Sequence, residues 1–229
     1  IRCTADIGTV SPDCRKTISL KKNVKRATAY VSAMGLYNFF INGSKVGKAL
    51  LAPGWTVLDK RVQYQTYDIT ELVTSETTFS IMGGEGWAIG RLGTPMKPRV
   101  NVYADHISVI AEIVIEYEDG SVDTILTDES WQVYTSKILT SGIYDGETVD
   151  TTVEPEFVCN ASADDTITAK LVEQIGEIVC ERERIAAKSY IVTPKGEKVI
   201  DFGQEVAGYV EIKIKGKRGD RIVTSCAEV

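Results

Sequence analysis

The segment Gly83 to Gly93, GGEGWAIGRLG, combines flexible glycines with one tryptophan and one arginine. Glycines let a loop bend back over a domain, while Trp87 offers an apolar plane for the C–H face of a sugar and Arg91 can donate hydrogen bonds to hydroxyl groups. A phosphate-binding loop needs a lysine after its last glycine and a following helix, and the sequence has neither. The alternatives are structural: Trp87 fills a core with its indole N–H bonded to a backbone carbonyl, and Arg91 forms a surface ion pair.

Acidic residues gather in a second segment, SGIYDGETVD at 141–150. Its carboxylates could line a pocket. The chain has 32 acidic residues, so carboxylates alone do not indicate the paired general acid and base of a hydrolase. The alternative is that Tyr144, Asp145 and Glu147 contact a neighbouring domain, as polar residues of ordered loops commonly do.

The stretch 35–68 indicates that β-strands carry these segments. In LYNFFINGSKVG the apolar residues alternate up to Asn42-Gly43, the dipeptide best suited to a tight type I′ turn. Pro53 and Gly54 then interrupt regular structure, and RVQYQTYDI resumes the period of two. We therefore expect a hairpin, an irregular crossing and a further strand.

Strand-like runs separated by turn signals continue along the chain, and no stretch shows a convincing 3.6-residue apolar period. The runs are RKTISL, RATAYVSA, LYNFFI, VQYQTYDI, TFSIMGG, ISVIAEIVIEY, SVDTILTD and WQVYTS. The turn Glu118–Gly120 joins two of them as an antiparallel hairpin, which is typical of a jelly roll or Greek key. The predicted fold class is all-β, a sandwich. Trp55 and Trp131 occupy strand-edge positions and could simply belong to its core.

The strand pattern lapses into small and polar residues between about Pro155 and Asp165, and strand-like segments return afterwards. We therefore predict a first domain at 1–160 and, at 161–229, a linker with the first strands of a second β-sandwich. A few strands alone leave edges and an apolar face uncovered. They are expected to pack on the first domain or to pair between two molecules as a dimer.

Composition narrows the possible partners. The net charge is −6 and His106 is the single histidine, while Lys and Arg cluster only in the short run KIKGKR, so nucleic acid is not expected as a partner. No apolar run approaches the roughly 18 residues of a membrane-spanning helix, so a membrane is not expected either. A neutral ligand fits this composition better.

The five cysteines are widely scattered and lack CxxC spacing, which argues against zinc. They are expected to be mostly reduced thiols, as in a cytoplasmic protein, with a local Cys3–Cys14 disulfide as the alternative. The chain begins at Ile1 rather than Met. We therefore expect an excised piece whose original targeting segment, if it had one, is missing.

The stretch 35–68 resembles the N-terminal β-sandwich module of bacterial α-L-rhamnosidases, whose pattern is roughly LYxxxxNGxxVGxxxLAPGWTxYxxRVxYxTYDxT. The segment 83–93 is similar to the family's GDGWYxGRLG element, and 141–150 is similar to its DIYDGExYDA run. Two residues depart from the pattern: Glu85 stands for Asp, and Ala88 stands for the usual aromatic residue. These departures bear on the sugar-stacking surface.

From Gly196 onward the sequence resembles the opening of the next module in the same enzymes, TPKGExxxDFGQNxxGWV. Here Glu205 replaces Asn and Tyr209 replaces Trp, the second a mild exchange between large aromatic residues. The resemblance covers nearly the whole chain. It implies a jelly-roll or galactose-binding-like sandwich followed by a partial second one.

The resemblance also implies where ligands bind. The expected sugar-binding residues are Trp87, Arg91, Glu85 and Asn101. Some members of the family bind L-rhamnose through calcium, an ion that prefers carboxylate, amide and carbonyl oxygens. Asp59 and Asp105 are the candidate metal ligands, although Asp59 could instead cap a turn and no EF-hand loop is present. Calcium is therefore a possible cofactor.

The resemblance places the catalytic residues elsewhere. In these enzymes the general acid and base lie in a helical barrel that follows the β-domains, and no helical stretch of this chain could be that barrel. We expect no catalytic residue here. Two roles follow: a module that binds rhamnose-containing carbohydrate, or a structural module that supports and orients the enzyme's missing catalytic domain. An unrelated adhesin or receptor sandwich is a third class, and it would require the motif match to be chance.

Overall fold

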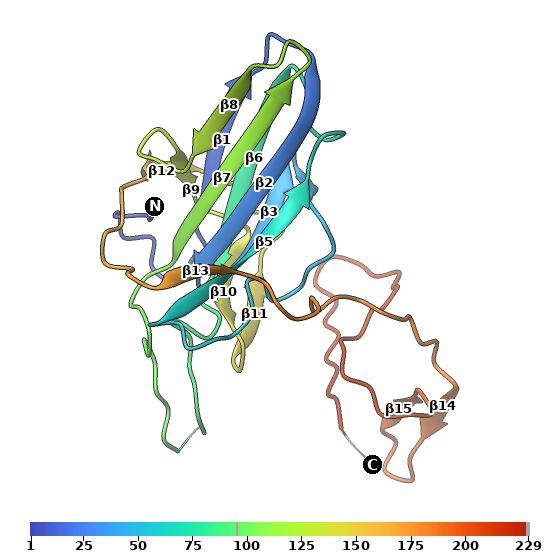
Figure 1. Cartoon of the computed structure of the whole chain (residues 1–229). Helices are drawn as coiled ribbons and strands as arrows, with labels where there is room; N and C mark the ends of the chain where they lie inside the picture. The colour runs from blue at the N-terminus through green and yellow to red at the C-terminus, as the bar shows by residue number, and fades with distance from the viewer. Residues whose placement is uncertain (95, 228–229) are drawn as a thin grey trace. The chain divides into compact units, whose positions relative to one another are not determined.

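The computed structural model describes residues 1–94 and 96–227, and these ranges contain fifteen β-strands and no helix. None of the described residues therefore belongs to a helix that could cross a membrane. The chain divides into two compact units, Ile1–Cys180 and a second unit that begins at Glu181. The first unit is a two-layered β-sandwich (Figure 1). The all-β fold class predicted from the sequence is confirmed.

One layer is an antiparallel sheet of six strands. In sheet order they are β12 (Phe157–Asn160), β9 (Gln132–Tyr134), β1 (Asp13–Ser19), β6 (Glu76–Gly84), β3 (Leu36–Ile41) and β4 (Ser44–Lys45). Apart from β3 and β4, neighbours in this sheet come from distant parts of the sequence. β1, for example, lies between β6 and β9.

The other layer has five strands. In sheet order they are β13 (Lys170–Glu173), β5 (Arg61–Asp68), β2 (Val24–Met34), β7 (Ser108–Tyr117) and β8 (Val122–Leu126). β13 runs parallel to β5, and the other pairs are antiparallel. Each strand-like run singled out in the sequence forms a strand of one of the two sheets.

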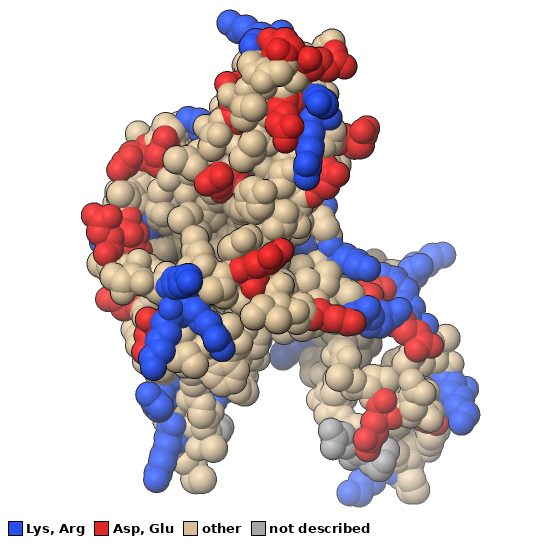
Figure 2. Space-filling view, in the orientation of Figure 1, with Lys and Arg blue, Asp and Glu red and all other residues tan. Residues whose placement is uncertain are grey.

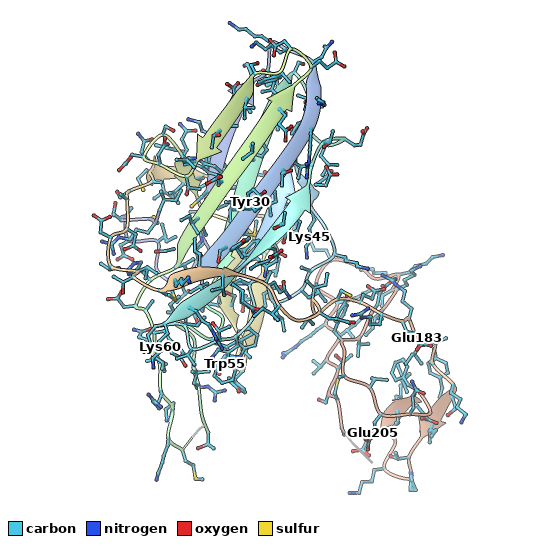
Figure 3. All side chains as sticks on the ribbon, viewed as in Figure 1. Tyr30, Lys45, Trp55, Lys60, Glu183 and Glu205 are labelled. Carbon is cyan, nitrogen blue, oxygen red and sulfur yellow. The ribbon has the colours of Figure 1, made fainter. Side chains whose placement is uncertain are left out.

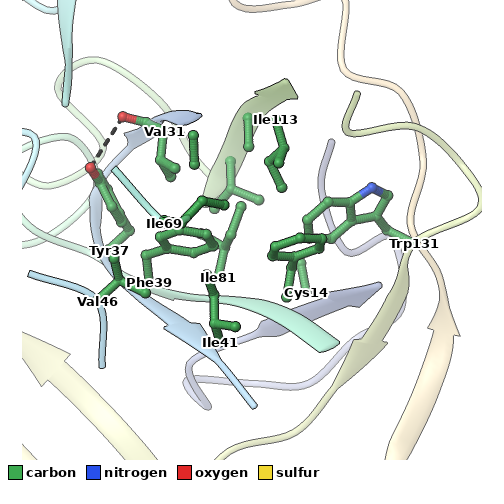
Figure 4. Packing of buried hydrophobic residues seen from close by; sticks show 14 of the residues in the cluster. Cys14, Val31, Tyr37, Phe39, Ile41, Val46, Ile69, Ile81, Ile113 and Trp131 are labelled. Carbon is green, nitrogen blue, oxygen red and sulfur yellow. Dashed lines mark hydrogen bonds between the residues drawn. The ribbon is translucent and has the colours of Figure 1, made fainter. Parts of the chain in front are cut away.

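The core lies between the sheets and follows the period of two along each strand. On the central strand β2, Ala27 and Ala29 stand in register beside Ile115 and Ile113 of β7, and all four are fully buried. Small residues on β2 leave room for larger side chains from the facing sheet, such as the fully buried Phe39 (Figure 4). Burying such a side chain contributes about 1.5–3 kcal/mol to the free energy of unfolding.

The hairpin predicted at Asn42-Gly43 is confirmed and joins β3 to β4. Both residues have positive φ, 49° and 79°, as a type I′ turn requires. The side-chain amide of Asn42 also holds the neighbouring strand, because its oxygen accepts a hydrogen bond of 2.8 Å from the backbone N–H of Thr78. Asn42 is therefore a structural residue of the turn.

The first unit extends beyond the predicted boundary at 160. β13 follows that position and still pairs with β5, and the division into units falls between Cys180 and Glu181. Two further hairpins stand apart from the main sheets: β10 (Ile138–Gly142) with β11 (Gly146–Val149) in the first unit, and β14 (Ser189–Val192) with β15 (Lys198–Asp201) in the second. Among the described residues, β14 and β15 are the strands of the second unit.

All five cysteines are free in the structure. Cys14 is buried in the sandwich core, whereas the thiol of Cys3 lies 3.8 Å from that of Cys159. The partner of Cys3 is therefore Cys159, and the Cys3–Cys14 disulfide considered from the sequence is not formed.

Candidate functional site

Two tryptophans stack on one another at the surface of the sandwich. The ring centroids of Trp55 and Trp87 are 5.8 Å apart and the rings are nearly parallel, at 5°. Trp55 is 53% exposed and therefore does not belong to the core, the place considered for it from the sequence. Trp131 is fully buried in the core, with its indole N–H bonded to the carbonyl of Leu126. Figure 3 shows Trp55 and Lys60 at the end of the sandwich where β5 begins.

A small apolar cluster supports the tryptophan stack. It is separate from the main core and contains buried Met34, Leu58, Val62 and Ala88, with Trp87 packed against it. Because strand side chains alternate between faces, Met34 lies on the opposite face of β2 from the core residue next to it. Ala88 is fully buried. Its small side chain therefore lets the Trp87 segment pack closely on the sheet, and the exposed aromatic surface comes from Trp55 instead.

Arg91 is held by the hairpin of β10 and β11. Its Nε lies 2.9 and 3.1 Å from the two carboxylate oxygens of Asp145, and its Nη2 lies 2.9 Å from Oδ1. Nη2 also donates to the carbonyl of Tyr144 at 3.3 Å, and the guanidinium lies over the Tyr144 ring. The hydrogen bonds that Arg91 donates to the carboxylate of Asp145 raise the pKa of Arg91. Arg91 thus forms the ion pair of the alternative interpretation, with a partner 54 positions away in the sequence.

Glu85 lies close to this ion pair. Burial, together with the charge of Asp145, raises the pKa of its carboxyl group above the ordinary value. A Cβ at Gly90 would stand 2.7 Å from the carbonyl oxygen of Gly86 and 3.3 Å from Oε2 of Glu85, so glycine permits this close turn. Residues predicted to bind sugar and residues predicted to contact another domain therefore meet here. We call Glu85, Arg91, Tyr144 and Asp145 the arginine cluster.

The remaining candidates lie apart from one another or in ordinary turns. Glu147 is exposed on β11, opposite Ser141. Asn101 is exposed and has a positive φ of 53°, and its backbone N–H donates to the carbonyl of Ile89. Their positions do not test the sugar-binding role predicted for Asn101 or the interdomain role predicted for Glu147, so both roles stay predictions.

Asp59 and Asp105 do not form a metal centre of acidic, histidine or cysteine ligands. Over residues 1–94 and 96–227 there is no group of three or more such side chains that could hold a metal ion. Asp59 is exposed in a turn, and Asp105 bonds the neighbouring His106, whose hydrogen bond lowers the pKa of the carboxyl group. A calcium role for these two residues stays a prediction from the sequence.

A partly buried polar cluster surrounds His106, and no pattern in the sequence indicated it. Asp164, whose side chain is 2% exposed, accepts hydrogen bonds from His106 Nε2 at 2.8 Å and from Ser108 Oγ. Arg2 Nη1 lies 3.3 Å from the other ring nitrogen, which also contacts Asp105. His106 and Asp164 are 58 positions apart. No motif signals a pairing over that distance.

Comparison with known proteins agrees with the fold and the motifs. Residues 22–189 match the family model of the alpha-L-rhamnosidase N-terminal domain, and residues 191–229 match that of the bacterial alpha-L-rhamnosidase concanavalin-like domain. An alpha-L-rhamnosidase of Streptomyces avermitilis is 32% identical over 91% of this chain and 21% of its own length. One from Formosa agariphila is 31% identical over 91% of this chain and 23% of its length. The chain therefore spans about a fifth of these relatives.

Solved structures give the same result. The Streptomyces avermitilis alpha-L-rhamnosidase complexed with L-rhamnose superposes with a TM-score of 0.76 at 30% identity, over 85% of this chain and 20% of that one. The alpha-L-rhamnosidase of Aspergillus terreus gives 0.75 at 29% identity, over 89% and 25%. The matched domain model covers most of the sandwich as well as its hairpins. The chain belongs to the α-L-rhamnosidase N-terminal domain family.

Proposed function

We propose that this chain is the N-terminal part of an α-L-rhamnosidase and serves as a module that binds rhamnose-containing carbohydrate. The observation that carries the proposal is the stacked pair of Trp55 and Trp87 with an exposed Trp55 ring. The family relationship supplies the class of ligand, since the relatives are alpha-L-rhamnosidases and one of them was solved with L-rhamnose.

The stack suits a sugar for a physical reason. Trp87 covers one face of the Trp55 ring and is itself fixed by the apolar cluster of Met34 and Ala88, so the Trp55 ring is presented as a supported apolar plane. A sugar can lay its C–H face on such a plane while its hydroxyl groups stay in water or bond to nearby polar groups. Figure 2 shows acidic and basic side chains interspersed with uncharged surface on one face of the molecule, which is compatible with a neutral ligand.

The module is proposed to act without hydrolysing its ligand. Hydrolysis of a glycoside requires a positioned acid and a second carboxylate that is free to act as base or nucleophile. In the arginine cluster, Asp145 is engaged by three short contacts to the guanidinium of Arg91, which leaves Glu85 without a free carboxylate partner in the cluster. We therefore expect no release of rhamnose from aryl rhamnosides by the chain alone.

Calorimetric titration of L-rhamnose into the full chain tests the binding role. Trp55→Ala is expected to weaken binding by about tenfold, because it removes the apolar plane that the sugar covers, and covered apolar surface contributes about 25 cal/mol per Å². Tyr190→Ala is the matched control, since Tyr190 is an aromatic residue with 78% exposure in the second unit. Equal binding by all three proteins would rule out the Trp55 site, and no heat with the unmodified chain would rule out rhamnose binding itself.

The same titration tests calcium. It is run once with calcium and once with a chelator, and Asp59→Asn and Asp105→Asn are added as variants. Binding that persists in the chelator would remove calcium from the site. Binding that needs calcium and is lost in both variants would assign these carboxylates to the metal.

A second role, structural support of a catalytic domain, is favoured by a different observation. Large apolar side chains of the second unit are exposed, among them Tyr209 at 70%, Val223 at 70% and Ile214 at 60%. Exposed apolar surface of this kind marks an interaction surface. The candidate partners are the catalytic domain of the same enzyme and a second copy of the chain. Light scattering over a range of concentrations separates them, because only pairing between copies gives a dimer whose mass is twice that of the chain.

A further inference from the structure

Two cysteines distant in the sequence lie side by side at one edge of the sandwich. The sulfur atoms of Cys3 and Cys159 are 3.8 Å apart, although 156 positions separate the residues. Both side chains are partly buried and pack against the main core. The Cys3 thiol also contacts the carbonyl of Ala5 at 3.5 Å. This distance corresponds to two thiols in van der Waals contact.

The backbone on both sides of the pair is fixed. Arg2 and Ser162 form an antiparallel bridge, with N–H···O distances of 2.9 and 3.0 Å in the two directions. Arg2 adjoins Cys3, and Ser162 follows shortly after Cys159 in β12. The two thiols therefore stay close without any large movement of the chain, and rotation of their side chains can bring the sulfurs to the roughly 2.0 Å of a disulfide.

Cys14, which lies in the core of the sandwich, is excluded as a partner for Cys159. In the six-stranded sheet Cys14 of β1 stands beside Val133 of β9, and Val133 stands beside Cys159 of β12. Cys14 and Cys159 are thus two strands apart, about 10 Å at the usual strand spacing. A disulfide cannot span that distance. Cys14 is also only 2% exposed.

We propose that Cys3 and Cys159 are a site of oxidative modification. A small-molecule disulfide such as oxidised glutathione oxidises the two thiols, and Cys3 and Cys159 become joined to each other by an intramolecular disulfide. One protein thiolate attacks a glutathione sulfur, so that a mixed disulfide forms and one glutathione thiolate leaves. The second protein thiolate attacks the protein sulfur of this mixed disulfide, and the second glutathione thiolate leaves. The two protein thiols are oxidised by two electrons, one glutathione disulfide is reduced to two thiols, and the protons of the protein thiols pass to the glutathione thiolates.

The bond would fasten an edge of the sheet. β12 is the outermost strand of the six-stranded sheet and pairs only with β9 there, so it is the strand of this edge that can most readily fray. The disulfide ties β12 to the segment of Cys3. Because it closes a long loop, it restricts the unfolded chain strongly, and the melting temperature is expected to rise by about 5–15 °C.

The reaction is expected to be slow at neutral pH. Burial, together with the neighbouring Cys159 thiol, raises the pKa of Cys3 to about 11. Only the thiolate attacks a disulfide, so a raised pKa lowers the reactive fraction. The rate should therefore increase as the pH rises toward that value.

Counting the free thiols of a variant with fewer cysteines tests the proposal. Replacing Cys180 and Cys226 by serine in the full chain leaves three of the five free cysteines, namely Cys3, Cys14 and Cys159. With oxidised glutathione at mildly alkaline pH, the number of free thiols is expected to fall from three to one, with the loss of two hydrogen atoms from the intact mass. A digest under non-reducing conditions is expected to link the peptides of Cys3 and Cys159.

Three further variants in that background make the test specific. Cys3→Ser and Cys159→Ser each keep two thiols and are expected to lose neither to an intramolecular bond, whereas Cys14→Ala has two thiols and is expected to lose both. The melting temperature should rise on oxidation only in the parent and in Cys14→Ala, and dithiothreitol should reverse the change. Three thiols that persist in the parent, oxidation that stops at a glutathione adduct, or a cross-link containing Cys14 would each overturn the proposal.

Discussion

The sandwich and the unit that begins at Glu181 share similar strand patterns but differ in how they bury apolar residues. The fully or nearly fully buried hydrophobic residues of the described chain all lie between Cys14 and Ala161. In the second unit the valines and isoleucines of β14 and β15 are exposed, including Val192 at 70%. Alternation along a strand is therefore enough to form a hairpin, but burial requires a second layer against which its apolar face can pack.

The two regions also differ in their charged contacts. In the second unit Arg184 pairs with Glu181 and Glu211, and the Arg184 side chain is 70% exposed. Exposed pairs of this kind contribute little to stability. In the sandwich, the carboxylate of Asp164 is almost completely enclosed and accepts several hydrogen bonds. The sandwich should thus account for nearly all of the free energy of unfolding.

Truncation of a core residue is expected to give the largest effect. Trp131→Ala removes a fully buried side chain and its hydrogen bond to Leu126, and should lower the free energy of unfolding by about 3–5 kcal/mol. Ile214→Ala in the second unit removes an exposed side chain and should change it by less than about 0.5 kcal/mol. Urea unfolding followed by circular dichroism measures both. A comparable loss for Ile214→Ala would show that the second unit has a core of its own in solution.

Two glycines offer the next comparison. Gly35 joins β2 to β3 with φ of +126°, and a Cβ there would stand 2.4 Å from the carbonyl oxygen of Gly84. Gly35→Ala should therefore lower the free energy of unfolding by about 2–3 kcal/mol, because the alanine must either hold a strained backbone conformation or force the backbone out of it. Gly208 in the second unit has no atom within 4 Å of such a Cβ. Gly208→Ala should leave the urea midpoint unchanged, and equal midpoints for both variants would contradict the tight crossing at Gly35.

The strands were predictable because they depend on local pattern. Alternating apolar residues specified the strands of both sheets, and Asn42-Gly43 specified a turn whose φ angles only such residues adopt readily. β12 was an exception, because Phe157–Asn160 lies in the stretch 155–165 where the strand pattern was expected to lapse, yet it pairs with β9. Strand-like segments were expected to return after that stretch, and β13 is one of them, but its pairing with β5 depends on the folded sheet rather than on its own pattern. For that reason the domain boundary was expected before β13 instead of after Cys180.

The contacts of the candidate site were not predictable in the same way. Trp55 meets Trp87, and Arg91 meets Asp145, only because loops from different strands converge at one end of the sandwich. The sequence supplied the right kinds of residue for Trp87 and Arg91 but not their partners. Pairings over such separations are set by sheet topology, and a single sequence carries no local signal for them.

A substitution at Asp164 tests whether an enclosed charge stabilises the sandwich, in contrast to the exposed ion pairs of the second unit. Burial alone would raise the pKa of Asp164, but the hydrogen bonds from Ser108, Thr166 and His106 lower this pKa below its ordinary value. A carboxyl group whose pKa is lower in the folded protein contributes stability above its unfolded pKa of about 4, and this contribution is lost as the pH falls through the folded value. Asp164→Asn should therefore cost about 1–3 kcal/mol at neutral pH.

Asp150 provides the matched control for this prediction. Both aspartates accept hydrogen bonds from the backbone N–H and the hydroxyl of the threonine two positions later in the sequence. Of the two, Asp164 also accepts hydrogen bonds from His106 and Ser108. Urea midpoints of Asp164→Asn, Asp150→Asn and the unmodified chain are compared at neutral pH and below pH 4. The deficit of Asp164→Asn should shrink as the pH falls, because the unmodified chain then loses its own charge contribution. A deficit that is independent of pH, or equal for both variants, would mean that the local turn and not the enclosed charge stabilises this part of the sandwich.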